Sequence, residues 1–219
     1  MRDLIIKIIN NTENVYEGDL RHYFKLVFNA PNKRNAFHNF RHMMHVTCET
    51  YKIACDMKYW ELTDKRRFRA LLIAAMFHDY DHSNKTLGND KDEIAKAIMG
   101  IKRYILPEDK GLLYEIEGLI SVTEYPHANC DPTTGAKILR DADMSQNFDD
   151  VWLQQIIFGL SEEMEIEPLE LLRRQVSFLN KIKFNTEYAE IYFLPILHNK
   201  IRTVEGLLEI LKDTEQIPA

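Results

Sequence analysis

The chain contains the stretch LLIAAMFHDYDH, in which seven consecutive apolar residues run directly into a histidine and an aspartate. Four of its residues are spaced four, three and four apart: Leu71, Ala75, His78 and His82. At about 3.6 residues per turn these four share one stripe of a helix, which changes from apolar to imidazole. A helix that is apolar on all sides is buried, so its end would present His78 and Asp79 together as two ligands for one cation. A buried histidine is also common as a plain core residue, so the interpretation depends on the rest of the chain.

The other segments favour helix as well. Strand-like alternation is absent, and only 8 Gly and 7 Pro interrupt the 219 residues. We expect helices over residues 2–10, 17–29, 39–57, 64–79, 90–104, 110–124, 133–147, 149–164, 168–183 and 186–213. Thr63 is the expected N-cap of the helix that carries His78. No repeat, low-complexity run or linker divides the chain, so we predict an all-α fold, a single compact helical bundle with one domain over residues 1–219.

Composition excludes several classes of protein. The net charge is −6 and the Lys and Arg residues form no block, so duplex nucleic acid is not an expected partner. No stretch approaches the ~20 apolar residues of a membrane span, and the first residues do not resemble a signal peptide. Cys48, Cys55 and Cys130 form no CxxC pair, which is typical of reduced thiols in a cytoplasmic protein.

A second helix contributes a row of histidines. His38, His42 and His45 are four and three residues apart, so they share one stripe of the expected helix over residues 39–57. Any one of them alone is more often a core residue than a ligand. Together with the His-Asp pair, the row indicates a metal site built from two helices.

A third helix can supply the last ligand. Asp141 and Asp143 lie between Leu139 and Met144, so an aspartate there would point inward and would be costly to bury without a partner. Either aspartate can be the ligand on this argument. A set of imidazoles and carboxylates suits manganese, iron, zinc or magnesium better than copper.

The order of these residues resembles a known superfamily. His42, then His78 with Asp79, then Asp143 follow the H…HD…D signature of the HD-domain metal-dependent phosphohydrolases, over about residues 37–147. That resemblance implies an HD-domain helical bundle and a reaction on a phosphoester.

Four motifs resemble those of one branch, the class I cyclic nucleotide phosphodiesterases. They are FHNFRH at 37–42 for Tyr-His-Asn-x-x-His, HDYDH at 78–82 for His-Asp-x-x-His, DMS at 143–145 for Asp-Leu-Ser, and QVSF at 175–178 for Gln-x-x-Phe. The third match favours Asp143 over Asp141 as the ligand. The chain departs from the family after the His-Asp motif, because its glycine comes late, at Gly88. A bacterial group of uncharacterised HD phosphohydrolases is similar too, at residues 123–127 (TEYPH) and 141–145 (DADMS) and in an acidic stretch after the His-Asp pair.

The resemblance implies that one or two divalent metal ions (Mn, Mg, Fe or Zn) bind to His42, His78, Asp79 and Asp143. Asp79 would bridge two metals, because a carboxylate has two oxygens. His38 is one turn before His42 and would act as the general acid that protonates the leaving oxygen. The alternative for His38 is a capping or supporting role.

Further residues are expected around the substrate. His82 would bond the bridging hydroxide or a water on a second metal, or lie on the helix surface. His127 would reach a second metal or a phosphate, or be an exposed loop residue. Gln175 would hydrogen-bond a purine and Phe178 would stack on it, although core packing is the simpler role for Phe178.

Two acidic groups have no assigned chemistry. Asp81, Asp90, Asp92 and Glu93 form an acidic run after the His-Asp pair. Either Asn89 or Asp90 simply caps the next helix, or an acid there holds water on a second metal. The five glutamates between positions 162 and 170 are expected to form a solvated face.

We therefore predict a metal-dependent phosphohydrolase. It would be a phosphodiesterase that hydrolyses a cyclic or oligomeric nucleotide with a metal-activated hydroxide and His38 as general acid. One alternative is a nucleotidase or nucleoside triphosphohydrolase, which the lack of a Lys/Arg cluster disfavours. Another is a nucleotide-binding HD domain without catalysis, usually marked by a lost ligand, and none is lost here. A di-iron oxygenase would need two further histidines between the His-Asp pair and the last Asp; His82 is too close to Asp79 for the usual pattern, which leaves His127 alone.

Overall fold

The structure, a computed structural model, describes residues 2–83, 90–125 and 132–214. In chain order its α-helices are α1 (Arg2–Asn10), α2 (Arg21–Phe28), α3 (Phe40–Asp56), α4 (Tyr59–Leu62), α5 (Lys65–Phe77), α6 (Asp90–Tyr104), α7 (Leu113–Ser121), α8 (Thr134–Met144), α9 (Ser161–Glu163), α10 (Pro168–Leu179), α11 (Glu187–Tyr192) and α12 (Leu194–Thr214). Two 3-10 helices, η1 (Pro107–Leu112) and η2 (Ser145–Phe148), and one π-helix, η3 (Leu153–Leu160), complete the described elements. Within these ranges no residue forms a β-strand. The predicted all-α fold is confirmed, and none of the described helices is long and apolar enough to cross a bilayer.

Helix α5 is the centre of the fold. Every residue from Phe68 to Phe77 is buried, and α5 contacts α2, α3, α6, α7 and α8. The apolar run therefore has the burial that its composition predicts. Because α5 is enclosed on all sides, the residues that follow its last turn start from a fixed position inside the protein.

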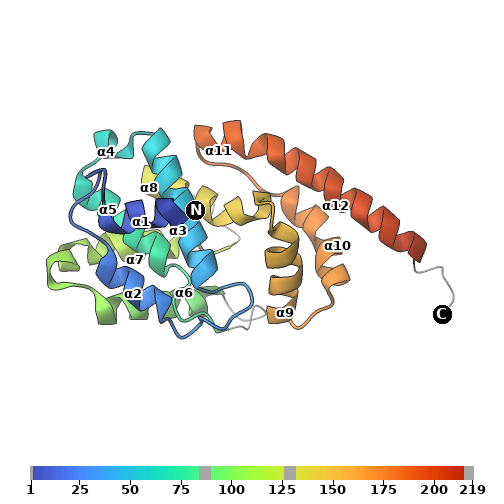
Figure 1. Ribbon diagram of the computed structural model, residues 1–219, viewed down its shortest axis with the longest axis horizontal. Coiled ribbons are helices and arrows are strands. Elements are labelled where there is room, and N and C mark those ends of the chain that lie inside the picture. Colours follow the sequence, from blue (N-terminus) through green and yellow to red (C-terminus); the bar gives the residue numbers. More distant parts are fainter. Residues whose placement is uncertain (1, 84–89, 126–131, 215–219) are drawn as a thin grey trace.

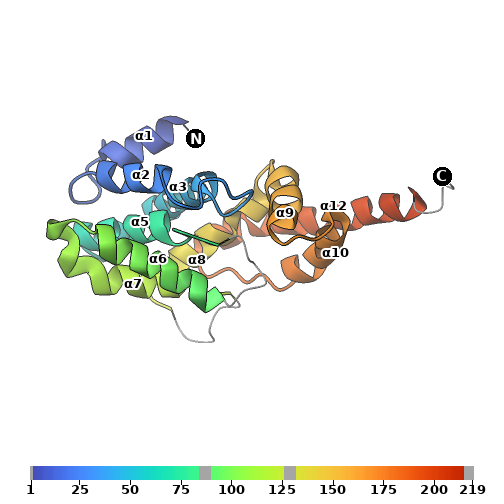
Figure 2. The same ribbon diagram turned by 90° about the horizontal axis from the view of Figure 1, so that it is seen from below.

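The helices are arranged in two groups along the long axis of the molecule. Helices α1 to α7 lie at one end, whereas α9, α10 and the C-terminal part of α12 lie at the other, in both views (Figures 1 and 2). Helix α8 and the following η2 and η3 connect the two groups. Contacts of η2 with both α3 and α12 hold them together.

Two sequence expectations are corrected. The N-cap of α5 is Asp64, whose carboxylate accepts a hydrogen bond from the Arg67 N–H; Thr63 instead ends the additional helix α4. The segment expected as one helix over 186–213 is two helices, α11 and α12. Pro195 explains the break, since proline has no N–H with which to continue the hydrogen bonding of α11, and it is tolerated in the first turn of α12.

Arg69 joins α5 to the surrounding chain inside the core. Its guanidinium donates to both carboxylate oxygens of Asp109 at 2.7 and 2.8 Å and to the carbonyls of Glu17 and Asp19, and the Tyr23 hydroxyl also donates to Asp109. Burial alone would raise the pKa of Asp109, but its bonds to Arg69 and Tyr23 outweigh that and lower it. The carboxylate's contribution to stability is therefore present at neutral pH and is lost only as the pH falls through this lowered pKa.

We expect Arg69→Met to lower the free energy of unfolding by about 3–5 kcal/mol, because the substitution leaves the Asp109 carboxylate buried without its partner. Urea unfolding at pH 7 measures this. The matched control is Arg67→Met on the same helix, whose exposed pair with Glu115 spans 3.8 Å and is expected to contribute about 0–1 kcal/mol. Equal losses in the two variants would contradict the assignment of Arg69 as a core anchor.

Candidate active site

Four side-chain atoms from three helices meet at the end of α5. His42 comes from the first turn of α3, whose start is fixed by the Asn39 side chain accepting the N–H groups of Arg41 and His42. His78 is the C-cap of α5 and Asp79 follows it, while Asp143 is in the last turn of α8. The Nε2 atom of His42 lies 3.2 Å from Nε2 of His78, and each of these nitrogens is 3.1 Å from Asp79 Oδ2 and 3.4 Å from Asp143 Oδ1.

The two imidazoles present bare lone pairs to this centre. His42 Nδ1 lies 2.7 Å from the amide oxygen of Gln146, and His78 Nδ1 lies 2.8 Å from the carbonyl oxygen of Ala75. Both acceptors lack a hydrogen, so each Nδ1 must carry the proton, and each neutral ring then has an unprotonated Nε2. Two lone pairs that face two carboxylate oxygens can be balanced by a cation between them or by protons on the imidazoles.

The spacing of the His42, His78 and Asp143 atoms fits a divalent metal, and Asp79 Oδ2 lies beside both histidines. Ligands about 2.1 Å from a metal are separated by ~3.0 Å at octahedral and ~3.4 Å at tetrahedral angles. The observed separations of 3.1–3.4 Å to and between the two histidines lie in that range. His42, His78 and Asp143 also form a cluster with geometry suited to a metal ion. The donor set therefore fits a metal of the kind that the sequence predicts.

The histidines and aspartates of this cluster shift one another's pKa values. Burial lowers the pKa of His42, but hydrogen bonds to Asp143 and Asp79 outweigh it and raise the value to about 9. Burial would raise the pKa of Asp143, yet the bonds and charges of His42 and His78 lower it. Without a metal, protons on the imidazoles balance the two carboxylates, so a metal and protons compete for the same positions.

Asp141 has a different environment from Asp143, although they are two residues apart on α8. Its carboxylate accepts hydrogen bonds from the backbone and side-chain N–H groups of Asn185 and from the backbone N–H and hydroxyl of Thr186. Asp141 thus attaches the start of α11 to α8 and faces away from the histidines. Of the two candidates left open by burial alone, only Asp143 approaches His42 and His78.

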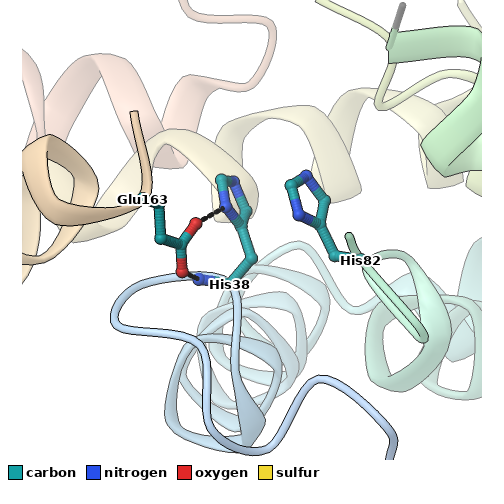
Figure 3. A group of neighbouring side chains, drawn as sticks. All are labelled: His38, His82 and Glu163. Atoms are coloured by element: carbon teal, nitrogen blue, oxygen red, sulfur yellow. Dashed lines mark hydrogen bonds and ion pairs between the residues drawn. The ribbon is translucent and has the colours of Figure 1, made fainter. Parts of the chain in front are cut away.

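We call His42, His78, Asp79 and Asp143 the metal-type cluster. His38 lies beside it and forms a second group with His82 and Glu163 (Figure 3). The Glu163 carboxylate accepts the backbone N–H groups of Phe37 and His38 with one oxygen, and its other oxygen is 2.6 Å from His38 Nδ1. The ring of His38 stacks on that of His82 with centroids 3.9 Å apart. This arrangement fixes the orientation of His38, because Nδ1 is held by the carboxylate and Nε2 is left for another partner.

The expectation that the five glutamates between positions 162 and 170 form a solvated face is wrong for Glu163. The residue is buried, and its pKa is lowered: burial would raise it, but the bonds to His38 and the backbone N–H groups outweigh that. Its approach to His38 needs a close contact between the π-helix η3 and the loop before α3. A Cβ on Gly159 would lie 3.0 Å from the Ala36 carbonyl oxygen, which only glycine avoids.

Two further histidines, His82 and His45, are also buried. Burial lowers the pKa of His82 to about 4, and its Nδ1 has no hydrogen-bond partner among the described residues. The expectation of a helix-surface role for His82 is therefore wrong. His45 turns away from the cluster and lies 2.9 Å from the hydroxyl of Ser145. Burial lowers its pKa to about 4, so it is neutral at neutral pH.

A cavity of about 390 Å³ opens onto both groups. One end is lined by His38, His42, His78, Asp79, His82 and Asp143. Gln175 and Phe178 of α10 also line the cavity, as do the apolar residues Ile156, Leu160 and Met164. Gln175 is buried, whereas Phe178 is half-buried with its ring 5.6 Å from that of Tyr125. Phe178 therefore packs against the core, as its helical spacing predicts, and its ring also forms part of the cavity wall.

The cavity lining is strongly acidic. Asp90 and Glu93 join Asp79 and Asp143, and Arg174 is the only lysine or arginine among the described lining residues. The Glu93 carboxylate accepts bonds from the backbone N–H and hydroxyl of Ser83, which attaches α6 to the end of the His-Asp segment. Burial raises the pKa of Asp90, and the negative charges of Asp79 and Asp143 add to that increase. His127 and Gly88 lie outside the described residues.

Residues 37–91, about a quarter of the chain, match the family of 3′5′-cyclic nucleotide phosphodiesterases. The predicted resemblance to this family is thereby confirmed over that segment, which contains His38, His42, His78, Asp79 and His82. No curated protein matches the chain. The match supports a hydrolase of the phosphodiesterase type and the use of a divalent metal, and it does not extend to Asp143, Glu163 or α10.

Proposed function

We propose that the protein is a metal-dependent phosphodiesterase that hydrolyses a cyclic mononucleotide. The observation that carries this proposal is the pair of bare Nε2 atoms on His42 and His78, which converge with two carboxylate oxygens beside the oriented His38. His42, His78, Asp79 and Asp143 would hold one or two divalent cations. The membership of the HD superfamily and the single domain over residues 1–219 belong to the same proposal.

The chemistry that a divalent cation supplies at such a site is neutralisation of charge on the phosphoryl oxygens and a lower pKa for water. The protein's own residues would do the rest. His38, with Nδ1 held by Glu163, would donate a proton from Nε2 to the departing ribose oxygen. Negative charge on Glu163 would stabilise the protonated ring, and His82, stacked on His38, would limit its rotation.

The charge of the cavity favours a diester over a polyphosphate. A diester carries one negative charge at the reacting phosphorus, whereas a nucleoside triphosphate carries several. Asp79 and Asp143 would face the metal, and in the rest of the described lining Asp90 and Glu93 outnumber Arg174, so a polyanion would meet net repulsion there. A volume of about 390 Å³ is near the lower end of the range of about 300–1,000 Å³ for small-molecule sites, which suits one nucleotide.

The test is hydrolysis by purified protein loaded with Mn²⁺. The panel contains 3′,5′-cyclic AMP and GMP, a linear dinucleotide, ATP, AMP and bis(p-nitrophenyl) phosphate. The expected result is turnover of the cyclic diesters and the activated diester, with little on ATP or AMP. Turnover of ATP or AMP alone would replace the proposal by a nucleotidase, and saturable binding without turnover of any member would leave a binding domain.

The part of the cavity lined by α10 would bind the base. One amide of Gln175 can both donate to and accept from a purine edge. We expect Gln175→Ala to raise KM for the cyclic purine nucleotides by about 5- to 30-fold, the equivalent of one or two hydrogen bonds. Steady-state kinetics on 3′,5′-cyclic AMP measures this.

Bis(p-nitrophenyl) phosphate serves as the internal control for Gln175→Ala, because it has no base, and its KM should not change. Ser177→Ala, an exposed position on the same helix, is the matched control variant. Unchanged base preference in Gln175→Ala would contradict the assignment of Gln175 to the base and leave the proposed metal site unaffected.

A further inference from the structure

Asn32 lies in the loop between α2 and α3 and bonds to both groups of the candidate active site. It is 2% exposed. One N–H of its amide donates to the carbonyl oxygen of His38 and the other donates to the carbonyl oxygen of Asp79, each at 2.7 Å. Its amide oxygen accepts the backbone N–H of Asp81 at 3.3 Å. Every hydrogen-bonding group of this side chain except one lone pair is therefore used on the backbone of the two segments.

The segment that Asn32 holds has an unusual backbone. Asp81 has φ of 66°, in the left-handed region, which is uncommon for a residue with a side chain. This conformation turns the chain sharply after Asp79, so that Asp79 faces the metal-type cluster while His82 reaches the ring of His38. The bond from Asp81 N–H to Asn32 stabilises the turn, and the bonds to His38 and Asp79 attach it to the loop that carries the proton donor.

We propose that Asn32 is a positioning residue that sets the placement of His38 relative to the metal-binding Asp79. The inference rests on the proposed phosphodiester hydrolysis. Asn32 would act entirely through the backbone: it touches neither the cavity nor the four ligand atoms. Its loss would let the loop that carries His38 shift relative to the His-Asp turn, which would misplace the proton donor while His42, His78 and Asp143 remain in place.

The test compares two leaving groups. A ribose alkoxide needs protonation as it departs, whereas p-nitrophenolate needs little, so a misplaced His38 affects only the first. Asn32→Ala should lower kcat on the best nucleotide diester of the panel by about 10- to 100-fold, the effect of a displacement of about 1 Å. On bis(p-nitrophenyl) phosphate the loss should be less than about 3-fold. The dissociation constant for Mn²⁺, measured by calorimetry, should rise by less than about 10-fold, the lower end for a residue that supports a ligand, because all four ligand side chains are kept.

A double-mutant cycle shows whether the effect passes through His38. In the His38→Ala background, Asn32→Ala should cause almost no further loss on the nucleotide diester, because the group that it positions is gone. Additive losses, equal losses on the two substrates, or a large fall in Mn²⁺ affinity would each overturn the inference. If Asn32→Ala does not fold, Asn32→Ser keeps one donor and should show the same dependence on leaving group at smaller size.

Asn11 provides a matched control. Its amide makes the same three kinds of bond far from the site, to the carbonyls of Tyr16 and Gly18 and from the N–H of Val15. Asn11 itself has φ of 49°, so Asn11→Ala adds backbone strain and should destabilise the fold without any leaving-group dependence. If Asn32→Ala behaves like Asn11→Ala in an active parent, only this inference fails. If the parent hydrolyses no diester, the proposed function fails, and with it the reaction that Asn32 would serve.

Discussion

Asp143→Asn is expected to abolish hydrolysis and to weaken Mn²⁺ binding by more than about 100-fold, the upper range for loss of a residue that only supports a ligand. The amide cannot offer a charged oxygen 3.4 Å from both His42 and His78, and it leaves one carboxylate to balance the cation. Calorimetric titration of the metal-free protein with Mn²⁺ measures the affinity. Thermal unfolding with and without Mn²⁺ gives an independent readout, because a ligand that binds only the folded state raises its stability.

Asp141→Asn is the matched control, two residues away on the same helix. It should retain Mn²⁺ affinity and most activity, while the free energy of unfolding falls because the bonds to Asn185 and Thr186 weaken. Loss of metal from Asp141→Asn with binding intact in Asp143→Asn would move the ligand to Asp141 and contradict the geometry.

The parts of the site that could be predicted from the sequence are those encoded by local spacing. His78 follows the apolar stripe of α5 by one helical repeat, and His38 and His42 are one turn apart, so a period of 3.6 places them without knowledge of the fold. The same period indicates that α5 is buried. Local spacing cannot decide between Asp141 and Asp143, because both lie on the same inward-facing helix. Only their distant partners distinguish them: positions 185–186 for Asp141 and position 42 for Asp143.

Residues that act across the chain could not be predicted in this way. Asn32, Gln146 and Glu163 bond to the motif residues over separations of 6 to 125 positions, and no periodicity links them. Glu163 nevertheless carried a usable signal: Ile156, Leu160 and Glu163 are four and three apart. This is the same continuation of an apolar stripe into a polar residue that identified His78, but the neighbouring glutamates concealed it.

The second large effect concerns the proton donor. His38→Ala should retain Mn²⁺ binding and lose about 10²–10⁴-fold in kcat on a nucleotide diester, the usual contribution of general acid catalysis. The loss should shrink strongly on bis(p-nitrophenyl) phosphate, whose leaving group departs without a proton. Equal losses on both substrates would assign His38 a positioning role instead.

Glu163→Gln tests the same chemistry one step away. The carboxylate holds His38 Nδ1 at 2.6 Å; a neutral amide of the same shape would keep the packing and remove the negative charge beside the ring. The kcat on the nucleotide diester should therefore fall, whereas kcat on bis(p-nitrophenyl) phosphate should change little, because only the first leaving group needs the proton from His38. Glu162→Gln, exposed on the same helix, is the matched control and should leave both rates unchanged. A Glu163→Gln enzyme with the parent rates but a lower free energy of unfolding would show that Glu163 only attaches the loop before α3 to α9.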